Sequence, residues 1–166
     1  MKKPDRSRVL GIVGSPRQDG NTEIMVDEIL KGAKEAGAEV EKILLGELAI
    51  APCQACYSCR DEGKCVQLDD MQELFEKMKQ SDVWVLGTPV YWWGPSAQLK
   101  AFVDRWLAKA NDRERKATFE GRRVILAVPM GDTDPATGRH VVGMFADALV
   151  SCPRNTLTKS FKLMKD

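Results

Sequence analysis

Histidine is nearly absent from this sequence of 166 residues, which contains only His140. Enzymes that work through an activated nucleophile commonly place a histidine against a serine or cysteine and an acid. His140 follows a glycine at the expected start of a helix, and we interpret it as a cap or surface residue. No Ser/His/Asp set is visible, so we assign no catalytic acid, base or nucleophile to the chain.

The sequence also lacks an excess of either charge: 25 Lys and Arg face 24 Asp and Glu, for a formal net charge of +1. Proteins that bind nucleic acid or anionic membranes carry clustered positive charge, so neither partner is indicated. No apolar run approaches the roughly 20 residues that cross a bilayer. The basic N-terminus leads directly into a strand-like run, so we expect no signal peptide and a cytoplasmic protein.

Cysteine is rare except at one place, where four of the five cysteines form the pattern Cys53-x2-Cys56-x2-Cys59-x5-Cys65. Cysteines this close on one loop rarely reach disulfide geometry, and cytoplasmic thiols stay reduced. A [4Fe–4S] cluster, zinc and a thiol-rich loop that binds nothing are the three interpretations. The spacing favours the cluster over zinc, because structural zinc sites usually use two separated ligand pairs. Cys152 is predicted to be a small core residue.

Strand-like and helix-like segments alternate along the chain. This alternation predicts an α/β fold with a doubly wound parallel sheet, helices on both faces and three layers. The predicted strands are residues 8–13, 40–45, 83–87 and 124–128, with a weaker candidate at 156–161. The predicted helices are residues 22–36, 69–80, 96–110 and 141–150.

Three loops follow the carboxyl ends of predicted strands, at residues 14–22, 88–95 and 130–138. In an open parallel sheet, ligands bind beyond these strand ends, at the point where the strand order reverses. We therefore expect the three loops to meet around a ligand.

The first of these loops joins a buried strand to a helix N-terminus, where backbone N–H groups and the helix dipole favour an anion. Its polar donors are Ser15, Arg17, Asn21 and Thr22. Gly20 is expected to adopt a positive φ. The loop has neither a Walker A motif nor the spacing of a dinucleotide fingerprint. A phosphomonoester is the favoured ligand, and an ordinary capped turn is the alternative.

The second loop is aromatic, with Tyr91, Trp92 and Trp93 between Pro89 and Gly94. Its proline and glycine prevent all three rings from continuing a strand into the core. Clustered rings at a strand end suit contact with a flat ring such as a flavin, whose potential the loop's backbone N–H groups could tune. The alternative is that one or two rings pack on the next helix or in a subunit interface.

Several motifs together resemble the NAD(P)H-dependent FMN reductase family of flavodoxin-like proteins. They are Gly14-Ser-Pro-Arg17 with Gly20-Asn-Thr22, Thr88-Pro-Val-Tyr-Trp-Trp-Gly-Pro-Ser-Ala-Gln-Leu-Lys100, and Phe102-Val-Asp-Arg105. The stretch Ala51-Pro-Cys-Gln-Ala-Cys-Tyr-Ser-Cys-Arg60, with Cys65 and Asp69-Asp-Met71, resembles the iron–sulfur flavoproteins of that family. The resemblance covers residues 8–150.

The resemblance implies a five-stranded sheet in the order 2-1-3-4-5 and one FMN-binding domain over residues 1–166. The cysteine loop, residues 51–66, would be an insertion after the second strand, and the C-terminal end is shorter than the family pattern. An FMN-dependent oxidoreductase is implied, which takes hydride from NAD(P)H and passes electrons to a flavin, quinone, nitro or azo compound, or iron centre. The alternative is an iron–sulfur flavoprotein that carries electrons between protein partners. Family members form homodimers or homotetramers whose interface covers the flavin.

The resemblance also assigns the site residues. The FMN phosphate would be held by Ser15, Arg17, Asn21 and Thr22. The isoalloxazine would be lined by Pro89, Val90, Tyr91, Trp92, Trp93 and Gly94, with Gly131 and Asp132 on its other side. In the iron–sulfur members, a [4Fe–4S] cluster would be ligated by Cys53, Cys56, Cys59 and Cys65. Relatives with similar cysteines and no cluster also exist, and the Tyr-Trp-Trp loop is more similar to theirs.

Overall fold

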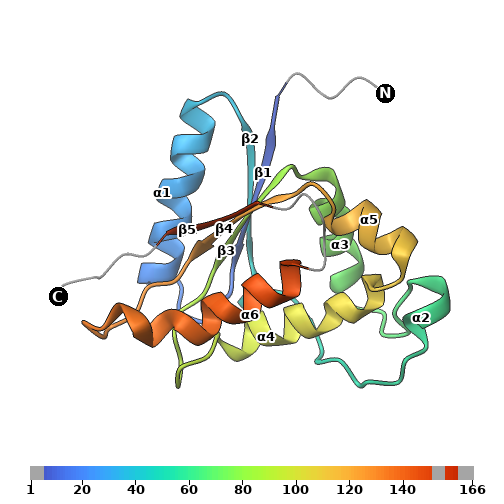
Figure 1. The fold of residues 1–166 in the computed structure, drawn as a ribbon. Helices are drawn as coiled ribbons and strands as arrows, with labels where there is room; N and C mark the ends of the chain where they lie inside the picture. Colours follow the sequence, from blue (N-terminus) through green and yellow to red (C-terminus); the bar gives the residue numbers. More distant parts are fainter. Residues whose placement is uncertain (1–5, 151–155, 161–166) are drawn as a thin grey trace.

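The computed structural model describes residues 6–150 and 156–160, which form a five-stranded parallel sheet between layers of helices (Figure 1). The strand order is β2-β1-β3-β4-β5, which confirms the predicted fold and order. The strands are β1 (Arg8–Val13), β2 (Glu39–Leu44), β3 (Val83–Gly87), β4 (Arg123–Ala127) and β5 (Thr156–Ser160). Each lies within one or two residues of the predicted bounds, and the three central strands β1, β3 and β4 are the short apolar runs expected of a buried parallel sheet.

The helices are α1 (Asn21–Glu35), α2 (Cys59–Glu62), α3 (Met71–Gln80), α4 (Ala97–Asp104), α5 (Asp112–Phe119) and α6 (Arg139–Val150). Three short 3₁₀ segments are η1 (Leu45–Glu47), η2 (Arg105–Lys109) and η3 (Pro135–Gly138). Within the described residues, no helix is both long and apolar enough to cross a bilayer.

Alternate strand residues divide the core between the two faces of the sheet. On β1, Leu10 and Ile12 join the larger cluster, which contains residues of α3, α4 and α6. Val9 and Val13 join the smaller cluster beneath α1. This alternation follows from the two-residue period of a strand, and it gives the sheet a covered surface on both sides.

The chain between α4 and β4 differs from the sequence prediction. The predicted helix 96–110 ends as an α-helix at Asp104 and continues as η2, and α5 was not predicted. Helix α5 is polar and lacks a strong apolar stripe, so its periodicity gave no signal. Its start is capped by Asn111, whose side chain accepts from the Glu114 N–H at 2.9 Å. Glu114 also pairs with Lys79 and Lys109, at 3.1 and 3.0 Å.

An aromatic cluster fixes η2 against the sheet. The ring of Trp106 lies 5.5 Å from Phe102, 5.1 Å from Phe119 and 6.2 Å from Trp84, between ring centroids. The buried indole of Trp84 donates to the carbonyl of Met78 at 3.1 Å. Tilted and edge-on aromatic pairs add roughly 0.5–1.5 kcal/mol each beyond their buried area. The residue before Trp106 is Arg105, so this cluster also sets the position of that arginine.

A buried carboxylate joins α1, β2 and the loop that precedes α1. Glu23 accepts from the Asp19 N–H at 2.8 Å and from the Lys42 ammonium at 2.7 Å. Lys42 also lies 2.9 Å from Asp27. The bonds from Lys42 and from the Asp19 N–H lower the pKa of Glu23, against the opposing effect of burial. Glu23 therefore stays ionised and holds the loop in place.

We predict that Glu23→Gln lowers the free energy of unfolding at pH 7 by about 1–3 kcal/mol, because charged hydrogen bonds are lost. The stabilisation by ionised Glu23 is complete above its ordinary pKa of 4.5 and disappears as the pH falls through the lowered pKa of the folded protein. The difference between wild type and variant in urea unfolding should therefore shrink in acid.

Glu28→Gln is the matched control, because Glu28 lies on the same helix and forms an exposed ion pair with Lys31 at 3.8 Å. It should cost less than about 0.5 kcal/mol. A Glu23→Gln effect as small as the control's, or equal at every pH, would contradict this role of Glu23.

Candidate functional site

A pocket of about 450 Å³ lies at the carboxyl ends of β1, β3 and β4, and the three predicted loops meet around it. Small-molecule sites usually span about 300–1,000 Å³. Its lining contains eight of the predicted residues: Ser15, Arg17, Asn21, Thr22, Pro89, Val90, Tyr91 and Gly131. The meeting of the loops follows from the parallel sheet, since all its strands end at one edge.

The pocket has a polar part and an apolar part. The N-terminus of α1 begins at Asn21, so free backbone N–H groups and the positive end of the helix dipole lie at the polar part. Arg17 adds a positive charge, and none of the residues that line the pocket is acidic. The apolar part is formed by Pro89, Val90 and Met130. This arrangement suits a ligand with an anionic group at one end and a flat apolar group at the other.

Hydrogen bonds fix the loops that form the pocket. The Ser96 hydroxyl donates to the Gly14 carbonyl in a short bond, and it accepts from the Leu99 N–H as the cap of α4. The Ser96 N–H donates to the Thr88 hydroxyl at 3.0 Å. A Cβ at Gly14 would lie 2.8 Å from the Leu99 Cβ and 3.0 Å from the Gly87 carbonyl oxygen. The first two loops are thus held in contact, and a residue larger than glycine at position 14 would not fit.

Four predicted residues do not line this pocket: Trp92, Trp93, Gly94 and Asp132. Trp92 and Trp93 form the two central residues of a tight turn, with positive φ values of 50° and 61°. The backbones of Tyr91 and Gly94 close the turn with bonds of 2.9 and 3.0 Å. Trp92 is 90% exposed, and its ring contacts only Trp93 among the described aromatic rings. Positive φ is uncommon for bulky residues, so this turn could not be predicted from residue preferences.

Three pocket residues were not among the assigned site residues: Gly20, Pro129 and Met130. Gly20 and Met130 lie in two of the loops that were expected to meet at the strand ends, and Pro129 lies two residues after β4. Gly20 was predicted to have a positive φ, and this is wrong: its φ is −82°, and Asp19 has the positive value of 53°. Asp tolerates the left-handed region better than most residues, which leaves Gly20 free to begin the helix.

The four clustered cysteines line a second, smaller pocket, together with Arg105. Cys59 begins α2 and is buried, which raises the pKa of its thiol. Cys56 is exposed, and the backbone N–H and hydroxyl of Ser58 lower the pKa of its thiol. The two pockets share no lining residue.

Within the described residues, no three His, Cys, Asp or Glu side chains lie close enough to hold a single metal ion. The four thiols are therefore not arranged as a zinc site. A four-iron cluster spreads its ligands over four corners, so it accepts thiolates from more widely separated positions. The donor set at this pocket, four cysteines of one loop, fits such a cluster.

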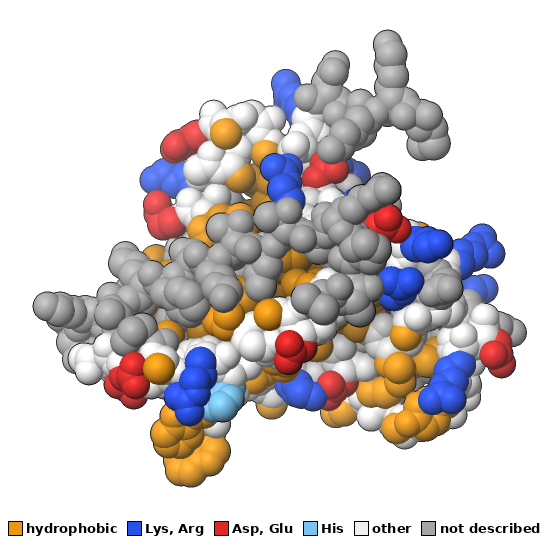
Figure 2. Space-filling view, in the orientation of Figure 1, with side chains coloured by type: hydrophobic (Ala, Val, Ile, Leu, Met, Phe, Trp, Pro, Cys, Tyr) orange, Lys and Arg blue, Asp and Glu red, His pale blue; other side chains and the backbone are white. Residues whose placement is uncertain are grey.

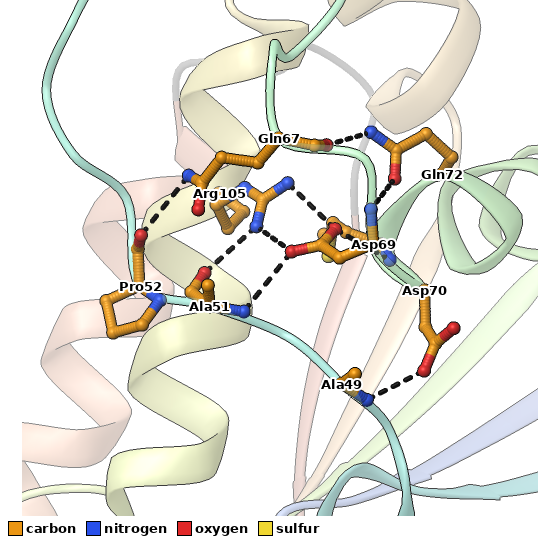
Figure 3. A network of polar contacts seen from close by, with 9 residues as sticks. Ala49, Ala51, Pro52, Gln67, Asp69, Asp70, Gln72 and Arg105 are labelled. Atoms are coloured by element: carbon orange, nitrogen blue, oxygen red, sulfur yellow. Dashed lines mark hydrogen bonds and ion pairs between the residues drawn. The ribbon is translucent and has the colours of Figure 1, made fainter.

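The two ends of the cysteine loop are joined by the guanidinium of Arg105 (Figure 3). It donates to the carbonyl of Ala51 at 2.9 Å, and to the two carboxylate oxygens of Asp69 at 2.5 and 3.0 Å. Asp69 also accepts from the Ala51 N–H at 3.2 Å. Next to it, Asp70 accepts from the Ala49 N–H at 2.7 Å. These bonds close the loop at its base.

Arg105 is buried, with only 1% of its side chain exposed. Burial opposes its charge, but Asp69 and the sulfur of Cys65 outweigh burial and raise the pKa of the guanidinium. Burial likewise opposes the charge of Asp69, and the bonds from Arg105 and Ala51 hold the pKa of that carboxyl below its usual value. The pair is thus ionised. The Nε atom of Arg105 is buried and has no hydrogen-bond partner in the described structure.

Comparison with known proteins agrees with the fold. An iron–sulfur flavoprotein of Methanocaldococcus jannaschii is 48% identical over 98 residues, which cover 59% of this chain and 51% of the relative. An iron–sulfur flavoprotein of Archaeoglobus fulgidus is 39% identical over 120 residues, or 72% of this chain and 54% of the relative. The chain thus spans about half the length of these curated relatives.

Among solved structures, the NAD(P)H:quinone oxidoreductase from Methanothermobacter marburgensis superposes with a TM-score of 0.74 at 19% identity. The match covers 94% of this chain and 83% of that one, and it shows that the two share a fold. Residues 7–141 match the family of NADPH-dependent FMN reductases. The sequence resemblance is therefore confirmed, and the chain belongs to the NADPH-dependent FMN reductase family.

Proposed function

We propose that the chain binds FMN in the pocket at the strand ends and is an oxidoreductase that takes hydride from NAD(P)H. The observation that carries this proposal is the division of the pocket, with a helix N-terminus and Arg17 at one part and apolar loop residues at the other. Bound FMN would supply the redox chemistry, which explains why the chain needs no acid or base of its own.

The pocket residues then have separate tasks. Ser15, Arg17, Asn21 and Thr22 would bind the phosphate by hydrogen bonds and charge. The flavin ring would be oriented, and water kept from it, by Pro89, Val90, Tyr91, Met130 and Gly131. The remaining predicted residues, Trp92, Trp93, Gly94 and Asp132, would act at the rim. Residues 1–166 would form one FMN-binding domain with the cysteine loop, 51–66, as an insertion.

A second copy of the chain would cover the rim, in a homodimer or homotetramer. Hydrophobic side chains project from the molecule where the loop between β3 and α4 lies (Figures 1 and 2). An indole that is 90% exposed, as in Trp92, is unusual on a free surface and suits an interface. The electron acceptor would be a small molecule that reaches the same pocket, such as a flavin, a quinone, a nitro or azo compound, or an iron centre.

The proposed activity has a direct test. When protein reconstituted with FMN is mixed with NADPH or NADH without oxygen, the visible flavin absorbance should bleach. Free FMN at the same concentration, mixed with the same nucleotide, is the control for the uncatalysed reaction. If the flavin absorbance bleaches no faster than in the control with either nucleotide, the reductase proposal is contradicted.

For FMN binding, we predict that Thr22→Val raises the dissociation constant about 10- to 100-fold, because one hydrogen bond to a charged phosphate is lost. Thr22 is only 3% exposed and lines the pocket, and valine keeps its shape. Thr118→Val is the matched control, since the Thr118 hydroxyl is buried, does not line the pocket and has no hydrogen-bond partner among the described residues. Flavin titration should show unchanged binding in the control, and equal binding in both variants would exclude Thr22 as a phosphate ligand.

The cysteine loop favours a second candidate function, an iron–sulfur flavoprotein that carries electrons between protein partners. Four thiols of one loop line a single pocket, and the two relatives described above are named as iron–sulfur flavoproteins. In this proposal Cys53, Cys56, Cys59 and Cys65 would ligate a [4Fe–4S] cluster, which would supply single-electron transfer.

Protein purified without oxygen should then contain about four iron and four sulfide per chain. Cys56→Ser should remove the iron and its broad visible absorbance while FMN stays bound, because the two pockets share no residue. Ser58→Ala, which leaves all four thiols in place, is the control. Wild-type protein with bound FMN but neither iron nor sulfide would leave the reductase as the function and contradict the cluster.

A further inference from the structure

Arg105 is the one residue outside the cysteine loop that brings a full positive charge to the cysteine pocket, among the described residues that line it. It belongs to η2, and its neighbour Trp106 is fixed in the aromatic cluster. The side chain is 1% exposed, so water does not screen this charge as it would at a surface. Its backbone is therefore positioned by the core of the domain, while its guanidinium also bonds to Ala51 and Asp69.

The contacts of Arg105 divide into two parts. The two terminal nitrogens are satisfied by Asp69 and by the carbonyl of Ala51. The Nε atom is buried without a hydrogen-bond partner in the described part of the chain. Buried N–H groups are almost always bonded, so this one calls for an acceptor. Arg105 lines the same pocket as the four cysteines, whose sulfur atoms can act as acceptors.

We propose that Arg105 tunes the reduction potential of a cluster held by the four cysteines, by donating from Nε to a sulfur of the site, while Asp69 partly offsets its charge. This inference rests on the iron–sulfur proposal above. One-electron reduction makes a thiolate-bound cluster more negative by one unit. A buried cation stabilises the more negative form, and hydrogen bonds to the sulfurs act in the same direction. Arg105 would thus raise the potential, and Asp69 would lower it.

Arg105 also closes the base of the loop, and this structural role must be separated from the electrostatic one. Both Arg105→Met and Asp69→Asn weaken the same clamp, so a purely structural effect would act in the same direction in both variants. Their charge effects are opposite. Arg105→Met removes the cation and leaves Asp69, whereas Asp69→Asn leaves the cation uncompensated and keeps an oxygen for it to bind.

The test is an anaerobic potentiometric titration of the cluster, by electron paramagnetic resonance, in the 166-residue protein reconstituted with FMN, iron and sulfide. Arg105→Met should shift the midpoint potential down, and Asp69→Asn should shift it up. Arg105→Lys keeps the charge and should lie nearer to wild type than Arg105→Met. Lys100→Met is the control for charge, because the Lys100–Asp104 pair is solvent-exposed, and it should leave the potential unchanged.

If the midpoint potential shifts in the same direction in both variants, or in neither, the inference about Arg105 is overturned. The iron–sulfur proposal still stands in that case, because the wild-type protein holds a cluster. Wild-type protein that takes up no iron and sulfide would overturn both. If Arg105→Met fails to fold or to hold iron, the inference is tested by comparing Asp69→Asn with wild type. An unchanged or lower midpoint potential in Asp69→Asn contradicts the proposed role of Arg105.

Discussion

The parallel direction of all five strands is the constraint on which the rest of the structure depends. Because every strand ends at the same edge, the loops that follow β1, β3 and β4 converge there. The loops after β1 and β3 are separated by more than 60 residues in the sequence. The pocket is thus a consequence of the topology. Helix α1 adds its N-terminus to that edge, so the polar part of the pocket lies at the positive end of a helix dipole.

The cysteine loop depends on a different contact, the buried pair between Arg105 and Asp69. A buried ion pair recovers its desolvation cost only when its geometry is good and its other polar atoms are bonded. Here the carboxylate accepts from two guanidinium nitrogens and a backbone N–H, so the condition is met at Asp69, whereas the Arg105 Nε has no partner among the described residues. Gln67 and Gln72 add bonds to the same base: the Gln67 amide donates to the Pro52 carbonyl, and Gln72 donates to the carbonyl of Gln67 (Figure 3). The loop is therefore shaped by the domain before any ligand binds.

Most of the fold could be predicted because its signals are local. Short apolar runs identified the strands, and the apolar stripe of α3, with Met71, Leu74, Phe75 and Met78, is buried as expected. Where the local signal is weak, the prediction failed. Helix α5 is held by the Asn111 cap and by ion pairs of Glu114 to lysines, and neither produces a hydrophobic pattern. The weak candidate at 156–161 is strand β5, whereas Cys152 lies outside the described residues.

The sequence by itself determined the fold class, the strand-end loops and the density of thiols in one segment, since each depends on residues close along the chain. Only the tertiary structure decided which of these residues meet. The exposure of Trp92 and the place of Met130 in the pocket depend on how distant loops fold together. Arg105 is the clearest case: in the sequence it ends the motif Phe102-Val-Asp-Arg105, and no role was assigned to it. It is a buried cation at the cysteine pocket only because the aromatic core fixes η2 beside a loop that begins more than 50 residues earlier.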